Sequence, residues 1–320
     1  MTSATVGVRR GRGRGRGSGR GRVLGSPLAR RRRRVFGPFL APALILYTVL
    51  FMVPTVYSFY ASFTSWDGFS NPRWKGTLNY DHLRHDPAFK DAFFNTMKLL
   101  FGCGIFLFVL SFAFMLMLRE MKGRKFIQGF IFLPHIVSGV ALAAFWDFLL
   151  NHDGMLNKGL HSVGVGAVDW LKPQWQFNAI LVAIVWINTG YYVTILMAGV
   201  DRIPPYYYEE AKLAGTNSWQ RFRHITLPMS WDVVGTAAVL WTIGTVKIFE
   251  FILAFSGSQG NLPTTNQWTS AMYVYGETIG GTSPIYDFGR ACAGAVVTLV
   301  AVVVVVVVLR RVTSRDRLEL

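Results

Sequence analysis

The chain has 320 residues, a formal net charge of +16 and a pI near 10.2. Hydrophobic residues make up 52% of it and charged residues only 16%, below the roughly 25% usual for soluble domains. This composition argues against a soluble nucleic-acid-binding protein, and 25 Phe, 12 Tyr and 10 Trp argue against a disordered one. It indicates a membrane protein, provided that the apolar residues cluster into spans.

The first 34 residues contain twelve arginines and no acid, so most of the net charge belongs to this segment. Residues 11–22 are almost entirely Gly and Arg without an apolar period, which predicts a disordered tail. Such a tail could bind anionic lipid or RNA. We favour a solvated cytoplasmic tail that fixes topology, with membrane lipid as a possible contact and no nucleic-acid partner. No cleavage site closely follows the next apolar run, so we expect that run to remain as an anchor.

Six apolar runs are long enough to cross a bilayer, which takes about 20 residues. We therefore expect an all-α integral membrane protein whose membrane domain covers residues 35–312, with a short C-terminal tail at 313–320. The predicted spans are Pro38–Thr64, Phe94–Leu118, Phe126–Leu150, Phe177–Val200, Val233–Phe255 and Phe288–Leu309.

Lys and Arg residues are distributed unequally between the loops on the two sides. With the N-terminus inside, twelve of them lie on the cytoplasmic side against eight outside, even when the N-terminal tail is left out. Because cytoplasmic loops carry an excess of Lys and Arg, we expect both termini to be cytoplasmic.

The loop between spans four and five, residues 203–230, predicts a helix–turn–helix elbow. Pro204 and Pro205 can end span four and begin a new helix at its first turn. Two acids, Glu209 and Glu210, are expected early in that helix, where its dipole tolerates them. Gly215 fits the position after the helix, which requires a positive φ.

A second short helix is expected after this turn. Asn217 and Gln220 have the spacing of a capping box, which would begin that helix. Pro228 is expected to end it before span five. The loop is too polar to enter lipid, and on its chemistry alone an ordinary capped loop remains an equal alternative.

The same loop resembles a signature of the permease subunits of binding-protein-dependent ABC importers. That signature reads Glu-Ala-Ala, then Gly, then Ile-x-Leu-Pro. The residues that match it here are Glu209, Glu210, Ala211, Gly215, Ile225, Leu227 and Pro228, with Glu210 in place of the first Ala. Further similarity, over about residues 38–312, is to the carbohydrate branch of the maltose-permease type.

The resemblance implies a type I importer permease in a bacterial cytoplasmic membrane, with the elbow docked on a separate ATPase. It implies three partners in all: a second permease subunit, with a heterodimer favoured, this ATPase as a cytoplasmic ABC ATPase dimer, and an extracytoplasmic solute-binding protein. The chain itself has no phosphate-binding Gly-x-x-x-x-Gly-Lys-[Ser/Thr] loop. We therefore expect no enzyme activity and no cofactor in this chain, with ATP and Mg²⁺ used by the partner ATPase.

Polar residues within the spans are candidates for a substrate path, because ionisable groups there usually face a cavity or a partner. Lys247 and Glu250 lie three residues apart in predicted span five, which would place them on one helical face, either as a packing ion pair or along the path. Span four adds the candidates Asn188, Tyr191 and Tyr192. Amides and aromatic rings can bind sugars, although aromatic residues in membrane proteins more often serve packing.

Other functions are weaker alternatives. A secondary transporter or channel would often show inverted repeats, and none is apparent. A membrane-embedded enzyme would need a metal cluster or a nucleophile–base pair, and we find no catalytic residue and no metal site. Within the ABC importers, a non-sugar polar solute such as glycerol 3-phosphate is the alternative substrate.

Overall fold

The computed structural model describes residues 38–119, 121–257, 261–282 and 284–313. The predicted tail 1–34 lies outside the described residues, as does the predicted C-terminal tail apart from Thr313. The chain divides after Thr55 into two units, and the elements that form the core belong to the unit that starts at Val56.

Four helices of the described chain are long and apolar enough to cross a membrane without a break, and they confirm predicted spans one, two, four and six. They are Pro38–Ala61, which includes η1 (Thr48–Met52) and α2 (Val53–Ala61); Pro87–Arg119, formed by α4 (Pro87–Met97), η2 (Lys98–Cys103) and α5 (Gly104–Arg119); α9 (Pro173–Val200); and α16 (Phe288–Thr313).

Predicted span three is bent rather than straight. Helix α6 (Arg124–Ile136) is followed by α7 (Gly139–Leu150) and α8 (Met155–Ser162) at a bend of 97°. Two residues with extended ψ values, Val137 and Ser138, separate α6 from α7. Pro134 in the last turn of α6 lacks a backbone N–H, which weakens the helix just before the break.

Predicted span five, Val233–Phe255, is wrong in its second half. Helix α13 (Trp231–Val246) ends at Val246, and a separate helix α14 (Glu250–Ser256) begins after a short break. The break frees backbone carbonyls, and the hydroxyl of Thr269 donates to the carbonyl of Ile248 at 2.9 Å. The pairing of Lys247 with Glu250 on one continuous helical face is therefore wrong. The second bent pair is not α13 with α14 but Ser218–Met229 with α13, at 74°; with each bent pair counted as one span, the described chain has up to six.

The remaining elements are short. A two-stranded antiparallel sheet joins β1 (Thr64–Ser65) to β2 (Arg73–Trp74). The short helices are α3 (Leu78–His85), α10 (Pro205–Leu213), α11 (Ser218–Arg221), η3 (Phe222–Thr226), α12 (Leu227–Met229), η4 (Thr265–Gln267) and α15 (Ser270–Thr278).

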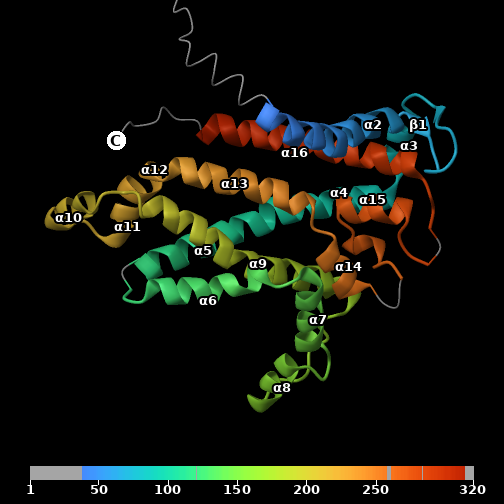
Figure 1. Cartoon of the computed structure of the whole chain (residues 1–320). Coiled ribbons are helices and arrows are strands. Elements are labelled where there is room, and N and C mark those ends of the chain that lie inside the picture. Colours follow the sequence, from blue (N-terminus) through green and yellow to red (C-terminus); the bar gives the residue numbers. More distant parts are fainter. Residues whose placement is uncertain (1–37, 120, 258–260, 283, 314–320) are drawn as a thin grey trace, which may run out of the picture. The chain divides into compact units, whose positions relative to one another are not determined.

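Helix α9 lies at the centre of the core and packs against α5, α6 and α13 (Figure 1). Its 28 residues are apolar around most of its circumference, which is typical of a helix buried on several sides. At Gly190 the backbone of α9 approaches the backbone of α6 at Ile131 so closely that a Cβ atom would clash there. Gly190 is therefore a packing residue that sets the distance between these two helices.

Candidate functional site

The segment 203–230, which we call the elbow, forms the first helix and turn that the sequence predicts. Pro204 caps α10 and Pro205 is its first residue. Gly215 follows the helix with a φ of +75°. The Gly215 N–H donates to the Lys212 carbonyl, and the Thr216 N–H donates to the Ala211 carbonyl. These two bonds form a Schellman motif, so the predicted role of Gly215 is confirmed.

The second helix begins with the predicted capping box. The Asn217 side chain accepts from the Gln220 N–H, and the Gln220 side chain accepts from the Asn217 N–H, both at 2.8 Å. The predicted end at Pro228 is wrong, because Pro228 lies within α12 and the chain bends by 74° only at Ser230. A π-turn, η3, directly precedes this proline. Its wider hydrogen-bonding pattern lets the helical path continue toward a residue that cannot donate.

The two acids also lie later in α10 than predicted. No acid is in its first turn, and Glu209 and Glu210 are its fifth and sixth residues, so the helix dipole gives them little support. Both side chains are exposed, but Glu209 lines a pocket and Glu210 does not.

The elbow is attached to the helical core by two buried aromatic side chains. The Tyr208 ring lies 3.2 Å from the Arg119 guanidinium at the end of α5. Its hydroxyl lies 3.1 Å from the Thr226 hydroxyl, which joins α10 to η3 within the elbow. The Phe222 ring packs in an edge-on contact against Phe112 of α5, within a cluster that includes Leu196 of α9. The elbow is thus held against α5 and α9 from one side.

The outer surface of the elbow exposes large apolar side chains. Leu213 is 90% exposed and Trp219 is 62% exposed. Leu213 and Trp219 are not signature residues. Of the signature residues, Ala211 is half-buried and its carbonyl accepts two bonds from Thr216. Ile225 and Leu227 are half-buried and Pro228 is exposed. Leu213 and Trp219 are large apolar side chains exposed on a polar helical turn, where a protein partner could cover them.

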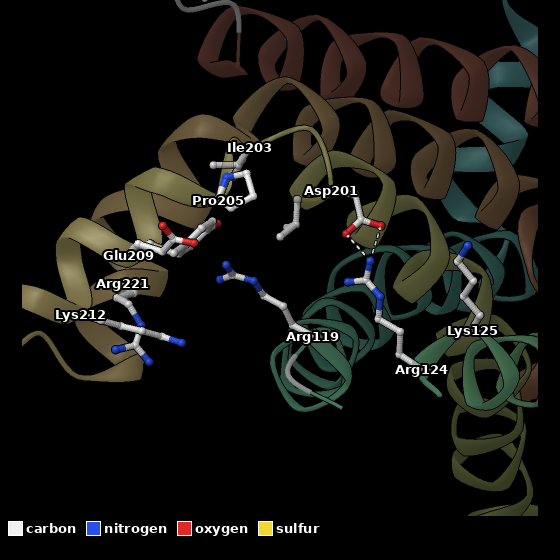
Figure 2. Close-up of a pocket in the computed structure, with 11 residues that line it drawn as sticks. Arg119, Arg124, Lys125, Asp201, Ile203, Pro205, Glu209, Lys212 and Arg221 are labelled. Carbon is white, nitrogen blue, oxygen red and sulfur yellow. Dashed lines mark hydrogen bonds and ion pairs between the residues drawn. The ribbon is translucent and has the colours of Figure 1, made fainter. Parts of the chain in front are cut away.

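A pocket of about 830 Å³ lies between the elbow and the adjoining ends of α5, α6 and α9 (Figure 2). Its lining contains five basic and two acidic side chains. The lining residues are Arg119, Arg124, Lys125, Val200, Asp201, Ile203, Pro205, Tyr208, Glu209, Lys212 and Arg221. The sequence did not indicate this pocket, since its walls come from residues that are up to a hundred positions apart.

Three of the basic groups in the pocket are held in place. The Arg119 guanidinium lies 3.2 Å from the centroid of the Tyr208 ring, a cation–π contact. Arg124 forms an ion pair with Asp201 at 3.0 Å, drawn as dashed lines in Figure 2. Arg221 donates to the Thr216 carbonyl at 2.6 Å. Their positive charges therefore have fixed places on the pocket walls.

The span-four candidates for the substrate path differ in burial. Tyr192 is 3% exposed and packs edge-on against Trp241 in the core, an environment that favours packing. Tyr191 is half-buried and its ring stacks on His135 of α6, with centroids 4.4 Å apart. Asn188 is half-buried and donates to the Ile184 carbonyl of its own helix.

Lys247 and Glu250 lie on either side of the α13–α14 break. Lys247 caps the end of α13 and Glu250 is the first residue of α14. Both are exposed, and no ion pair joins them among the described residues. Within those residues there is also no group of three or more His, Cys, Asp or Glu side chains that could hold a metal.

Sequence reasoning missed a buried polar cluster formed by α15, α16 and the start of α4. Glu277 pairs with Arg290 at 2.7 Å, and Arg290 also lies 3.3 Å from Asp287. The Tyr273 hydroxyl donates to Asp86, which caps α4. Burial raises the pKa of Glu277 to about 7, and the nearby Asp287 and Asp86 add to that effect while Arg290 opposes it. Burial and the bond to Asp86 raise the pKa of Tyr273.

Comparison with known proteins identifies the chain's family. The family described as the inner membrane component of binding-protein-dependent transport systems matches residues 21–317. The chain belongs to this family. It is therefore a membrane transport component, as the elbow signature predicted, and not an enzyme.

Individual relatives agree with this assignment. The chain is 30% identical over 269 residues to the lactose transport system permease protein LacF of Rhizobium radiobacter, covering 82% of this chain and 89% of that protein. It is 28% identical to the trehalose/maltose transport system permease protein MalF of Thermococcus litoralis, covering 90% and 97%.

A solved structure shares the fold. It is that of a bacterial alginate ABC transporter in complex with alginate pentasaccharide-bound periplasmic protein. One of its chains matches with a TM-score of 0.73 and 22% identity, covering 89% of this chain and 97% of that chain. The predicted importer-permease architecture is confirmed at the level of the fold.

Proposed function

We propose that this chain is one transmembrane subunit of an ATP-driven importer that carries a sugar across the bacterial cytoplasmic membrane. Family membership supports the importer, and the relatives named for lactose and for trehalose and maltose support a sugar as the substrate. The excess of Lys and Arg in the corresponding loops supports a cytoplasmic position for both termini and for the elbow.

The observation that carries the coupling proposal is the geometry of the elbow. The Tyr208 ring contacts Arg119 and the Phe222 ring contacts Phe112, which fixes the elbow to the transmembrane helices. Leu213 and Trp219 of the elbow remain exposed. A partner that bound the exposed side could move the helices through the buried side. We infer that the partner is a cytoplasmic ATPase dimer, which would use ATP and Mg²⁺.

Two further partners complete the proposed assembly. A solute-binding protein outside the membrane would deliver the sugar, in keeping with the binding-protein-dependent family and with the periplasmic protein present in the alginate transporter structure. A second permease subunit would supply the other half of the path, and we favour a heterodimer.

For the sugar path we propose the region around Tyr191. Its half-buried ring stacks on His135 close to the bend between α6 and α7, and aromatic faces can stack on sugar rings. Asn188, Lys247 and Glu250 remain candidates for polar contacts. Tyr192 is the weakest candidate, since its side chain is enclosed in the core.

Reconstitution tests the proposed function. Proteoliposomes that contain this chain, its partner permease and the ATPase should take up the sugar bound by the binding protein only when ATP is supplied on the ATPase side. The sugar itself is identified by calorimetry of the binding protein with mono-, di- and oligosaccharides. Uptake driven by an ion gradient without the ATPase would contradict the proposal.

A further inference from the structure

The pocket beneath the elbow lies where three apolar helices end. Arg119 is the last residue of the Pro87–Arg119 helix, Arg124 is the first residue of α6, and Val200 is the last residue of α9. The apolar run of a membrane-spanning helix ends at the level of the lipid headgroups, and the apolar runs of these helices end at Leu118, Phe126 and Val200. The pocket is therefore at the depth of the lipid phosphates.

The charge of the pocket suits a phosphate. Five basic side chains line it against two acids, and one of those acids, Asp201, is already paired with Arg124. Figure 2 shows the Arg119 side chain pointing from α5 toward the elbow, which contributes Lys212 and Arg221, whereas Lys125 lies at the far edge of the pocket beyond Arg124. A phosphate between Arg119 and the elbow could contact both.

Helix α6 exposes large apolar side chains that follow its pocket residues in the sequence. Phe126 is 82% exposed and Phe130 is 70% exposed. They are four residues apart and so lie on the same face of the helix, directly after Arg124 and Lys125. An acyl chain attached to a phosphate in the pocket could follow this face, which a soluble phosphate compound would leave uncovered.

We propose that the pocket binds the phosphate headgroup of an anionic phospholipid. The depth of the site and the exposed face of α6 favour a lipid over a soluble phosphate or an acidic segment of a protein. Basic pockets between transmembrane helices are suited to such headgroups. Bound in this way, the lipid bridges the elbow to the α5–α6 turn and limits the movement of the elbow. This inference does not depend on the proposed sugar or on ATP coupling.

The test measures lipid binding to the delipidated full-length chain in neutral detergent by native mass spectrometry. Phosphatidylglycerol should bind clearly more tightly than phosphatidylcholine. The variant Lys212→Gln should bind phosphatidylglycerol about five-fold more weakly, for the loss of one charge. The matched control Arg223→Gln removes one exposed elbow charge that does not line the pocket, and it should bind like the wild type.

A second pair of variants works in the opposite direction. Glu209→Gln removes an acid from the pocket and should tighten phosphatidylglycerol binding by about five-fold. Glu210→Gln removes the neighbouring exposed acid, which does not line the pocket, and should have no effect. Opposite shifts in the two pocket variants cannot come from general loss of folding.

Several results would overturn the proposal. Equal losses in the pocket variant and its control would assign the effect to net charge. Complete displacement of the lipid by millimolar inorganic phosphate would assign the pocket to a soluble anion. Unchanged lipid binding together with loss of the copurifying ATPase in Lys212→Gln would assign the pocket to the protein partner.

Discussion

The two ends of the Pro87–Arg119 helix have opposite kinds of surroundings. At the start, Asp86 caps the helix and accepts a bond from Tyr273, next to the buried Glu277–Arg290 pair. At the other end, about 50 Å away along an ideal helix of 33 residues, Arg119 faces a pocket beside the elbow.

This difference separates a fixed end of the helix from an adaptable one. Direct hydrogen bonds and ion pairs surround the start of the helix, and Asn95 donates to the backbone carbonyls of residues 266 and 268. At the other end, basic groups surround an open volume and the elbow exposes apolar side chains. We infer that the first end resists movement while the second transmits it.

The largest predicted effect comes from breaking the fixed end. Arg290→Ala leaves the carboxylate of Glu277, which is 7% exposed, without its partner. We expect a loss of about 3 kcal/mol in the free energy of unfolding at pH 8, measured by thermal unfolding of the purified chain.

A double variant isolates the ion pair. Arg290→Ala/Glu277→Gln removes both charges and should recover a substantial part of the lost stability, because no unpaired charge stays buried. If the double variant is as unstable as Arg290→Ala, packing rather than charge accounts for the loss.

The pH dependence of the fixed end should be the next largest effect. Because the pKa of Glu277 is raised to about 7 from an ordinary value of 4.5, the folded chain holds a proton that the unfolded chain releases. The resulting stability is fully present below pH 4.5 and is lost as the pH rises through 7.

Comparison with Glu277→Gln, which cannot ionise, reveals this contribution. The stability of the wild type relative to the variant should fall between pH 5 and pH 8, by on the order of 2 kcal/mol. A constant difference across that range would contradict the raised pKa.

A smaller effect is expected at the turn of the elbow. Gly215→Ala places a side chain at a φ of +75°, with open space around the Cβ position, and should cost about 1 kcal/mol. Gly76→Ala is the matched control, since Gly76 also has a positive φ and open space.

The two glycine variants should have similar stabilities but different activities. Only Gly215→Ala should lower the amount of sugar imported per ATP hydrolysed, because only Gly215 shapes the elbow. Equal transport by both variants would show that this turn does not affect coupling.

The smallest predicted effect concerns the contact within the elbow that joins α10 to η3. Tyr208→Phe removes the hydroxyl contact with Thr226 and should lower stability by about 0.5–1 kcal/mol. Tyr206→Phe, at a neighbouring half-exposed tyrosine, should have less effect. Chemical denaturation of both variants measures the difference, and a larger loss in Tyr206→Phe would count against a stabilising role of the Tyr208–Thr226 contact.

The sequence predicted features that depend on local chemistry. The turn at Gly215 and the capping box at Asn217 rest on contacts between residues three to five apart, so their spacing was sufficient. The straight spans α9 and α16 followed from the length of their apolar runs.

Features that depend on the direction of the chain or on distant residues could not be predicted. The breaks after Ile136 and after Val246 lie inside apolar runs. Because hydropathy reports only composition, the hydropathy profile gives no signal of either break. The Glu277–Arg290 pair and the pocket depend on packing between separate helices. Their charged residues were visible in the sequence, but their neighbours were not.

The central claim is that the elbow couples ATP hydrolysis to sugar import. It is tested most directly by the ratio of ATP hydrolysed to sugar imported, measured with the assembled transporter in proteoliposomes. Glu209→Lys in the elbow should raise this ratio several-fold while the protein still inserts. Asp153→Lys, at an exposed acid in the α7–α8 turn, should leave the ratio unchanged. A wild-type ratio in Glu209→Lys would contradict the assignment of the elbow as the coupling element.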